Sequence, residues 1–439
     1  MSPKTLDHWL DYIEQIHPKT IDMGLDRVLQ VRNSMGRSFA GPVITVGGTN
    51  GKGSTCAMLE SILLAAGYRV GLYTSPHLLR YNERIRVNGK EVTDAKLCEA
   101  FEQVESARAS FAEPGKSVAL TYFEFGTLAA WDVFVGASLD VVVLEVGLGG
   151  RLDAVNIFDA DAAILTSIDL DHMDYLGDTR ESIGREKAGI FRRGKAAIVS
   201  DPVPPASIVA HGHDIGADLQ LIGRDFGYQG DRQQWQFWGR GGKRPTLAYP
   251  ALRGANQLLN ASAVLAALDS LRDRLPVGMN HIRLGLAMVE LPGRFQVLPG
   301  RPTVVLDVAH NPHAAAVLSE NLSNMGFFPD THAVFSILGD KDIVGVCRAL
   351  RGRVSHWHVA PLPGPRGRNA ASIEKDIVGS AVGGTVTAYA SPREAYVAAR
   401  RLVNENDRIV VFGSFLMVAE VMEAINAEDA HHRDGPVTP

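Results

Sequence analysis

The run Gly47-Gly48-Thr49-Asn50-Gly51-Lys52-Gly53-Ser54 has the residue types of a loop that binds phosphate groups. It follows a β-branched run at residues 43–46 and precedes an Ala- and Leu-rich segment at residues 54–66. Successive glycines allow backbone N–H groups to turn towards an anion, and the N-terminus of a following helix adds positive potential. Lys52 supplies a mobile positive charge, and Ser54 supplies a hydroxyl group for phosphate or metal. The sequence therefore predicts a nucleotide phosphate site at Thr49, Asn50, Gly51, Lys52, Gly53 and Ser54.

The spacing of this loop differs from the common pattern G-x-x-x-x-G-K-[ST]. Gly53 follows the lysine, so the hydroxyl group of Ser54 comes one residue later than in that pattern. The difference argues against GTPases, P-loop kinases and motor ATPases. It resembles the loop of the Mur-type amide ligases, which reads G-T-N/K-G-K-[GT]-[ST].

Polar residues also follow three further apolar runs, at the ends where open α/β sheets place their ligands. Ser75 follows residues 69–73, Glu145 lies at the end of residues 139–146, and His172 comes soon after residues 162–167. A carboxylate that ends an apolar strand needs a charged partner or a metal ion to offset its desolvation. His172 alone could be a hydrogen-bonded surface residue. Because oxygen donors suit Mg²⁺ and one imidazole is tolerated on a second ion, we predict that Ser75, Glu145 and His172 bind two Mg²⁺ ions.

The elements that must position these residues follow an α/β pattern, in which β-branched runs alternate with Ala- and Leu-rich segments. The first part has predicted strands at residues 43–46, 69–73, 139–146, 162–167 and 196–200, and the second part at residues 303–307, 332–337, 356–360 and 408–412. Helices are predicted within residues 1–18, at 256–271 and from Pro312, and antiparallel hairpins within residues 201–249. The apolar strands indicate a largely parallel, buried sheet.

The length of 439 residues exceeds one ordinary core and predicts more than one domain. Residues 291–301, with proline and glycine on each side of Phe295, are typical of an interdomain linker. We predict one domain at residues 1–297, a second at residues 298–427, and a disordered polar tail at residues 428–439.

The composition is 46% hydrophobic and 21% charged, with a net charge of −5, which gives no basic field for nucleic acid. The cysteines Cys56, Cys98 and Cys347 are scattered, which favours a reducing compartment. No segment approaches the roughly 20 apolar residues that span a bilayer. We therefore expect a cytoplasmic monomer without nucleic-acid or membrane partners.

Together, the motifs resemble the folylpolyglutamate synthase/dihydrofolate synthase family of the Mur ligase superfamily, in its bifunctional bacterial type. The matching stretches extend from about Ile21 to Met417 and read GTNGKGS, YTSPHL, LTYFEFGTLAAW, LEVGLGGRLDAVN, TSIDLDHMDYLG, ESIGREKAGIFR, LPGRFQ, LDVAHNPHA and VFGSF. The phosphate loop alone would indicate only the wider superfamily.

The resemblance implies a Mur-ligase-like P-loop ATPase domain with a parallel-rich sheet, a smaller Rossmann-like α/β domain after it, and a nucleotide between them. It adds Asn260, Arg294 and Asp307 to the ATP contacts. A pterin-bearing substrate would contact Asp22, Met23, Gly24, Leu25, Thr121, Tyr122, Phe123, Glu124, Asp153 and Ala154, and His310 and Asn311 would border the glutamate site. Phe123 could stack on a flat pterin or simply pack in the core.

Lys187 shows where the residues and the resemblance disagree. By its chemistry alone it is an ordinary solvated lysine on a helix. It matches, however, the family lysine that CO₂ converts to a metal-bridging carbamate. Such a carbamate would turn a cation into an anionic oxygen ligand, which suits Mg²⁺.

The implied activity is ATP-dependent addition of L-glutamate to 7,8-dihydropteroate and to the γ-carboxylate of reduced folates, through an acyl phosphate. Lys52, Lys187 and His172 would be the catalytic residues. A cell-wall Mur ligase would usually carry an N-terminal UDP-binding domain, for which the early phosphate loop leaves no room. The alternatives that stay open are a Mur-type ligase for another carboxylate and a P-loop kinase or ATPase.

Overall fold

The structure of this protein is a computed structural model that describes residues 5–110, 117–230, 234–254 and 256–433. The chain divides into two compact units. The first unit comprises Met1–Ala251 and Gln257–Glu290, and the second comprises Leu252–Asn256 and Leu291–Pro439. The domain boundary that we predicted after residue 297 therefore falls inside the second unit.

The described residues of the first unit form an eight-stranded sheet in the order β4-β3-β2-β5-β1-β6-β7-β8. Its strands are β1 (Val43–Gly47), β2 (Val70–Tyr73), β3 (Ile85–Val87), β4 (Lys90–Glu91), β5 (Val141–Glu145), β6 (Ala162–Leu165), β7 (Ala196–Val199) and β8 (Asp218–Leu221). The pairs from β2 to β8 along this order are parallel, and β3 and β4 pair antiparallel. Strand β1 lies between β5 and β6, so the carboxyl ends of these three strands meet at one edge of the sheet.

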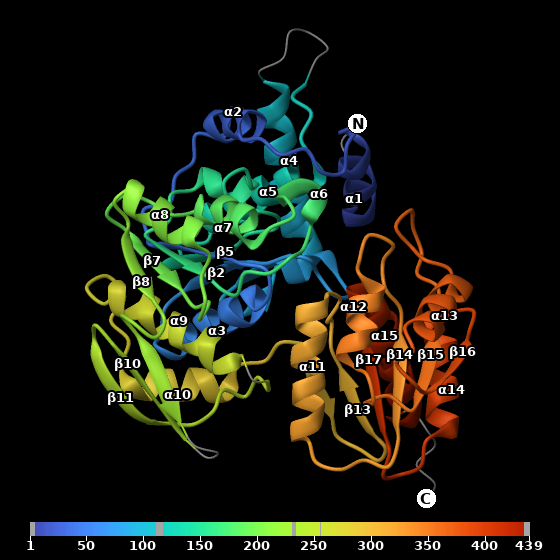
Figure 1. The fold of residues 1–439 in the computed structure, drawn as a ribbon. Coiled ribbons are helices and arrows are strands. Elements are labelled where there is room, and N and C mark those ends of the chain that lie inside the picture. Colours follow the sequence, from blue (N-terminus) through green and yellow to red (C-terminus); the bar gives the residue numbers. More distant parts are fainter. Residues whose placement is uncertain (1–4, 111–116, 231–233, 255, 434–439) are drawn as a thin grey trace, which may run out of the picture. The chain divides into compact units, whose positions relative to one another are not determined.

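Helices cover both faces of this sheet (Figure 1). Helices α3 (Lys52–Ala65) and α9 (Gln257–Ser270) pack on one face, with α10 (Met279–Met288) against α3. On the other face lies α5 (Tyr122–Gly136), which contacts α1 (Leu6–Gln15), α2 (Asp26–Met35) and α4 (Asp94–Ala109). The remaining helices of this unit are α6 (Met173–Leu176), α7 (Arg180–Ala188), α8 (Ala206–Asp214) and the 3-10 helices η1 (Tyr81–Arg84) and η2 (Ala154–Ile157).

The described residues of the second unit form a six-stranded sheet in the order β12-β13-β17-β14-β15-β16 (Figure 1). Its strands are β12 (Gln296–Leu298), β13 (Thr303–Leu306), β14 (Thr331–Phe335), β15 (His356–Val359), β16 (Thr385–Ala388) and β17 (Arg408–Phe412), and all pairs except β12–β13 are parallel. Its helices are α11 (Pro312–Asn324), α12 (Ile343–Ala349), α13 (Ala370–Gly379), α14 (Pro392–Leu402) and α15 (Phe415–Arg433). Both units have the parallel-rich α/β architecture that the sequence predicts.

Residues 291–301 are not a plain linker. The chain turns at Gly293 and Gly300, whose φ angles are 72° and 142°, in the region that favours glycine. Between these turns β12 pairs antiparallel with β13 at the edge of the second sheet. The proline and glycine residues therefore bend an edge strand, and the segment belongs to the second unit.

The predicted disorder of residues 428–439 is wrong for residues 428–433, because α15 continues to Arg433. Alanine and glutamate are strong helix formers and extend the helix through this polar stretch. Residues 434–439 lie outside the described residues.

Residues 201–249 contain the predicted antiparallel hairpins, formed by β9 (Gly227–Gly230), β10 (Trp235–Gly239) and β11 (Gly242–Leu247). The hairpin prediction is wrong for the first part of this stretch, which forms α8 and the parallel strand β8. Helix α8 is short, and it is held by burying Ile208 and Gly212. Tertiary packing of this kind overrides a weak local pattern.

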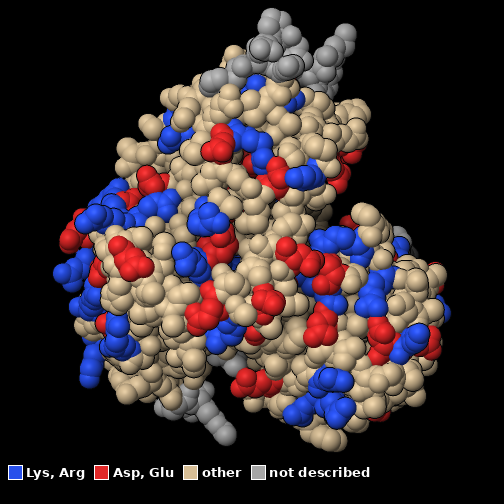
Figure 2. Space-filling model, turned by 45° about the horizontal axis from the view of Figure 1, so that its top comes forward, with Lys and Arg blue, Asp and Glu red and all other residues tan. Residues whose placement is uncertain are grey.

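Acidic and basic side chains are interspersed over the face of the molecule shown in Figure 2. The face shown therefore has no large area covered by charges of one sign. None of the described helices combines the length and the apolar character that crossing a membrane requires.

A pair of leucine substitutions tests the core of the first unit. Leu128, on α5, is fully buried in the core, whereas Leu284, on α10, is 53% exposed. We expect Leu128→Ala to lower the free energy of unfolding of this unit by about 2–5 kcal/mol, because it removes buried methyl groups and leaves a cavity. Leu284→Ala should change it by less than about 1 kcal/mol. Urea denaturation of both variants measures the difference, and equal losses would contradict the packing described here.

Candidate active site

The phosphate loop joins the end of β1 to the start of α3, which is the strand–turn–helix context that the sequence predicts. Gly48 and Gly51 have φ angles of 136° and 97°. A Cβ atom added to Gly48 would lie 1.8 Å from Thr166 Oγ1, so no side chain fits at this position. The loop can adopt this conformation only because residue 48 is a glycine.

The loop is fastened to the chain that follows β6. Thr49 N donates to the carbonyl oxygen of Ser167 at 2.7 Å, and Ser167 Oγ donates to the carbonyl oxygen of Asn50 at 3.1 Å. Thr49 Oγ1 also donates to the carbonyl oxygen of Asp169 at 3.1 Å and accepts from Asp169 N at 3.0 Å. These bonds bring the segment that contains Asp171 and His172 beside the phosphate loop, as the strand order predicts.

Two lysine side chains converge on the loop. Lys187 Nζ donates to the carbonyl oxygen of Gly48 at 2.9 Å, and Lys52 Nζ donates to the carbonyl oxygens of Gly48 and Thr49, each at 3.2 Å. Lys187 is only 6% exposed, so the interpretation as a solvated lysine is wrong. Burial, with a further contribution from the charge of Lys52, lowers the pKa of Lys187 to about 7. An amine with this pKa is partly neutral near pH 7 and can act as a nucleophile.

The predicted metal ligands come from adjoining strand ends. Glu145 is 3% exposed at the end of β5, opposite Val46 of β1, and its Oε2 accepts from Ser75 N at 3.1 Å. His172 precedes α6 with a φ angle of 53°. The structure thus brings Ser75 and Glu145 together, while the ligand set as a whole stays a prediction. Within residues 5–110, 117–230, 234–254 and 256–433, no three His, Cys, Asp or Glu side chains are grouped to hold a metal ion.

Asn260 lies on α9 against the phosphate loop. It is 5% exposed, and a Cβ atom added to Gly51 would lie 2.7 Å from its Oδ1 atom. Asn260 Nδ2 donates to Gln257 Oε1 at 3.1 Å, and Gln257 Nε2 donates to Ser54 Oγ at 3.4 Å. Helix α9 therefore lies against the phosphate loop, although the two are about two hundred residues apart in the sequence.

The predicted pterin contacts gather around α5 and the loop after β5. An added Cβ at Gly147 would lie 2.6 Å from the Phe123 ring, and one at Gly149 would lie 3.2 Å from Met23 Cε. Phe123 is partly exposed, and its ring centroid lies 5.9 Å from that of Tyr73. The Phe123 ring therefore packs beside Tyr73 and Gly147 and keeps part of its surface exposed.

The turn after this loop is held by Asp153. Its carboxylate accepts from Leu148 N at 2.8 Å and from Val155 N at 3.0 Å. Burial raises the pKa of Asp153 to about 6, and the backbone bonds oppose that rise. Ala154 is buried at the start of η2, so this pair shapes the turn as well as bordering the predicted substrate site.

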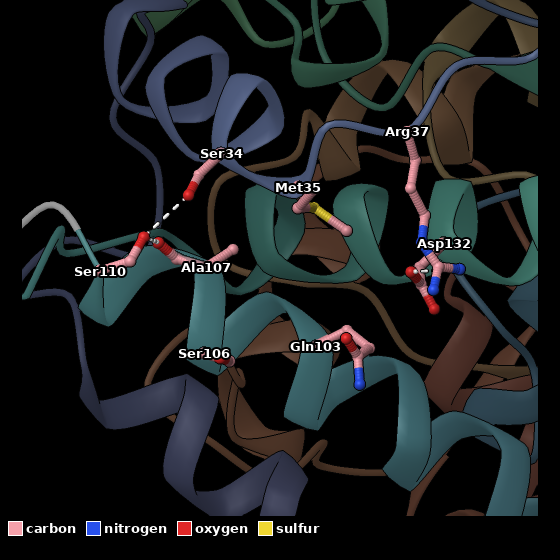
Figure 3. A pocket seen from close by; sticks show the side chains of 8 residues that line it. All are labelled: Ser34, Met35, Arg37, Gln103, Ser106, Ala107, Ser110 and Asp132. Atoms are coloured by element: carbon pink, nitrogen blue, oxygen red, sulfur yellow. Dashed lines mark hydrogen bonds and ion pairs between the residues drawn. The ribbon is translucent and has the colours of Figure 1, made fainter.

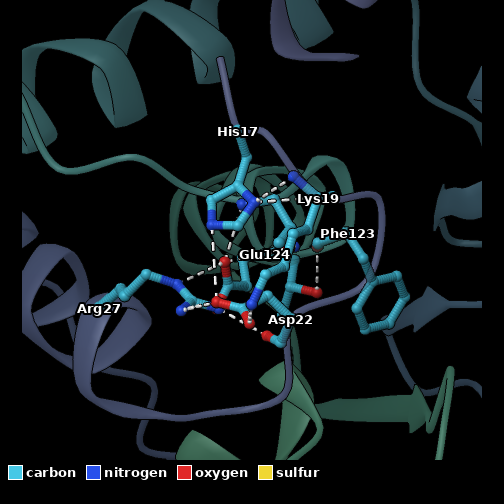
Figure 4. Close-up of polar contacts among 8 residues, drawn as sticks. His17, Lys19, Asp22, Arg27, Phe123 and Glu124 are labelled. Atoms are coloured by element: carbon cyan, nitrogen blue, oxygen red, sulfur yellow. Dashed lines mark hydrogen bonds and ion pairs between the residues drawn. The ribbon is translucent and has the colours of Figure 1, made fainter. Parts of the chain in front are cut away.

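Asp22 and Glu124 are joined by a residue that the sequence analysis did not single out. Arg27 donates to both carboxylates, as Figure 4 shows. The signal that could have found it is an arginine close to a predicted contact segment, with the acidic residues Asp22 and Glu124 among the predicted contacts.

Four predicted residues lie in the second unit. The carboxylate of Asp307 accepts from Phe295 N at 2.8 Å and from Ala309 N at 2.7 Å, and burial raises its pKa although Arg294 opposes the rise. The guanidinium carbon of Arg294 lies 4.9 Å from the Phe415 ring centroid. His310 Nδ1 lies 2.8 Å from the carbonyl oxygen of Val308, and Asn311 Oδ1 caps α11 by accepting from Ala314 N. These residues cluster around the end of β13, whereas their ATP and glutamate contacts stay predictions.

A polar pocket of about 240 Å³ lies elsewhere in the first unit, between α2, α4 and α5 (Figure 3). It is lined by Ser34, Met35, Arg37, Gln103, Ser106, Ala107, Ser110 and Asp132. None of these is a predicted site residue. Arg37 Nη1 lies 3.1 Å from the buried carboxylate of Asp132, so a partly exposed ion pair lines one side of the pocket.

Comparison with known proteins identifies the family. The Mur ligase middle domain matches residues 46–204, and the Mur ligase, glutamate ligase domain matches residues 293–415. The dihydrofolate synthase/folylpolyglutamate synthase of Escherichia coli (strain K12) is 46% identical over 423 residues, which cover 96% of this chain and 96% of that protein. The chain belongs to the dihydrofolate synthase/folylpolyglutamate synthase family.

Solved structures of this family agree with the fold. E. coli FolC in complex with DHPP and ADP has a TM-score of 0.91 and 45% identity, covering 98% of this chain and 99% of that chain. A bifunctional folylpolyglutamate synthase/dihydrofolate synthase with Mn, AMPPNP and L-glutamate bound has a TM-score of 0.88 and 43% identity, covering 97% and 100%. The family resemblance and the fold class predicted from the sequence are confirmed.

Gly48→Ala tests the geometry of the phosphate loop. We expect this variant to lose ADP binding, because the new methyl group would collide with Thr166 and push the loop away from its position. Gly67→Ala is the matched control: its φ angle of 87° is also positive, but an added Cβ meets nothing within 4 Å. Gly67→Ala should cost about 1 kcal/mol of stability and keep the wild-type affinity. Isothermal titration with ADP measures both, and unchanged affinity in Gly48→Ala would refute the assignment of the loop.

Proposed function

We propose that this chain uses ATP to join L-glutamate to 7,8-dihydropteroate and to the γ-carboxylate of reduced folates, through an acyl phosphate. The observation that carries the proposal is the convergence of Lys52 and Lys187 on the phosphate loop, with Glu145 at the adjoining strand end. The relatives support it, since one solved structure holds DHPP with ADP and another holds Mn, AMPPNP and L-glutamate.

In the proposed reaction, a carboxylate oxygen of the pterin substrate attacks the γ-phosphorus of ATP, and the bond to the ADP oxygen breaks. Lys52 and the backbone N–H groups of the loop stabilise the negative charge that spreads over the transferring phosphoryl group. The amine of glutamate, after losing a proton to solvent, attacks the acyl carbon and releases phosphate. The chain supplies position and electrostatic stabilisation rather than a nucleophile of its own.

The predicted metal ligands fit a divalent cation by their chemistry. Ser75, Glu145 and His172 offer a hydroxyl, a carboxylate and an imidazole, and the Glu145 carboxylate is buried beside the loop. Hard oxygen donors suit Mg²⁺, which would neutralise phosphate charge when bound. Two ions remain our proposal for this site.

We further propose that Lys187 carries a carbamate. Its buried amine reaches the loop, and its lowered pKa leaves it neutral often enough to react with CO₂. The carbamate would add an anionic ligand to a set that has one carboxylate, Glu145. Lys52, Lys187 and His172 are the proposed catalytic residues.

The remaining contacts are proposals too. Arg294 and Asp307 would bind ATP together with Asn260, and His310 and Asn311 would bind glutamate. A cytoplasmic monomer stays our expectation, supported for the compartment by the free cysteines Cys56, Cys98 and Cys347.

Lys52→Ala tests the proposed reaction. We expect turnover to fall by on the order of 100-fold or more, because a charge aimed at the transferring phosphoryl group is lost. Lys195→Ala, which removes a half-exposed lysine paired with Asp161, should leave turnover near wild type. Phosphate release is measured with ATP and glutamate, offering dihydropteroate and tetrahydrofolate in separate reactions. Near wild-type turnover in Lys52→Ala would refute the role of the loop, and release with neither substrate would refute the substrate class.

Labelled bicarbonate tests the carbamate. Wild-type protein equilibrated with ¹³C-bicarbonate should give a carbamate carbon signal that weakens as pH falls below about 7, because protonation of Lys187 blocks attack on CO₂. Lys187→Arg should abolish the signal, since arginine stays protonated. Lys195→Arg should retain it. A signal that survives in Lys187→Arg would assign the carbamate elsewhere.

A further inference from the structure

The segment between α1 and α2 has no regular secondary structure, yet it contains the predicted pterin contacts Asp22, Met23, Gly24 and Leu25. Such a segment lacks the backbone ladder that fixes a helix or a strand, so side-chain contacts must hold it in place. Met23 lies against Gly149, which places the segment at the loop after β5.

Arg27, in the first turn of α2, makes that connection (Figure 4). Its Nη1 atom donates to Asp22 Oδ2 at 2.5 Å, and its Nη2 atom donates to the Asp22 carbonyl oxygen at 2.5 Å. On its other side, Nη2 donates to Glu124 Oε1 at 3.0 Å and Nε donates to Glu124 Oε2 at 3.3 Å. One guanidinium group therefore ties the irregular segment to α5 by four hydrogen bonds.

The far end of this connection is a helix start. Glu124 is 4% exposed, and its Oε2 atom also accepts from Thr121 N at 2.8 Å and from Thr121 Oγ1 at 3.0 Å. The bond from Thr121 N and the one that Glu124 N donates to Thr121 Oγ1 at 3.3 Å together form the capping box of α5. Phe123, which lies between the two capping residues, contacts Gly147. The position of the Phe123 ring thus depends on the same carboxylate that Arg27 holds.

The near end is reinforced by the segment itself. Lys19 Nζ donates to Asp22 Oδ1 at 3.0 Å, and His17 Nε2 lies 3.6 Å from Asp22 Oδ2. Both carboxylates are therefore engaged by protein groups, which is the pattern of residues that shape a site. Only arginine has the planar fork of donors that can serve two carboxylates and a carbonyl group at once.

We infer that Arg27 is a positioning residue for the flat aromatic head of the acid substrate. It holds residues 22–25 and the start of α5 on either side of the loop that follows β5, and it acts through Asp22 and Glu124. This inference rests on the proposed function and adds a residue to it. Without Arg27, the buried Glu124 carboxylate loses its cationic partner, and the segment loses its tie to α5.

The experiment compares Arg27→Ala, Arg27→Lys, Glu124→Gln and the double variant Arg27→Ala/Glu124→Gln. We expect Arg27→Ala to raise KM for dihydropteroate on the order of tenfold or more, with KM for ATP changed less than about twofold. Arg27→Lys keeps the positive charge but not the planar fork of donors, so its KM for dihydropteroate should lie between those of wild type and Arg27→Ala. Since Arg27 acts through Glu124, the double variant should show about the KM of Arg27→Ala alone.

Arg37→Ala is the matched control, because Arg37 comes just after α2 and, like Arg27, pairs with a buried carboxylate on α5, that of Asp132 (Figure 3). A purely structural role would lower the melting temperature in Arg27→Ala and Arg37→Ala without a selective change in KM. Equal KM values for dihydropteroate in wild type and Arg27→Ala, or additive effects in the double variant, would overturn the inference. If Arg27→Ala does not fold, the inference is tested with Arg27→Lys and Glu124→Gln. Each should raise KM for dihydropteroate more than KM for ATP. Absence of wild-type turnover with every pterin substrate would overturn the proposed function and this inference together.

Discussion

Two amino groups share one carbonyl oxygen at the centre of this protein, since Lys52 and Lys187 both donate to Gly48. Desolvation and mutual repulsion make this arrangement costly, and the lowered pKa of Lys187 is its direct consequence. The N-terminus of α3 adds positive potential at the same place. A site built in this way favours the binding of anions, and it favours the neutral form of the buried Lys187 amine.

The backbone around Gly48 holds that carbonyl group in a fixed position. The backbone at Gly48 lies so close to Thr166 that only a hydrogen atom fits in the place of a side chain. Hydrogen bonds of Thr49 and Ser167 then join the loop to the chain after β6, which places the segment of Asp171 and His172 beside the loop. Carboxylates at Asp171 and Asp153 partly compensate the lysine charges, which explains how the cluster tolerates burial.

The substrate side of the site follows a different physical rule. Here the chain is irregular, and its order comes from ion pairs and hydrogen bonds between side chains that are distant in sequence. Arg27 and Glu124 are 97 residues apart, yet their contact fixes both the segment after α1 and the start of α5. Loss of one partner from such a contact is costly where the other partner is buried, as Glu124 is.

Much of the fold could be predicted because most of the buried central strands are apolar runs that can be recognised locally. Residues 409–412, for example, form an apolar run in the sequence and lie in the fully buried strand β17. The helix in residues 428–433 and the parallel strand β8 escaped prediction, because a polar helix and a short strand resemble loops when viewed locally. The predicted metal ligands, for their part, were inferred from strand ends, and the structure brings two of them, Ser75 and Glu145, together.

By itself, the sequence determined the phosphate loop, the α/β pattern and the family resemblance, because each of these depends on residues that are neighbours along the chain. Only the tertiary structure decided that Lys187 is buried against Gly48, that Asn260 lies under Gly51, and that Arg27 joins Asp22 to Glu124. The physical reason is that burial and charge pairing are properties of the surroundings, and those surroundings come from distant parts of the chain.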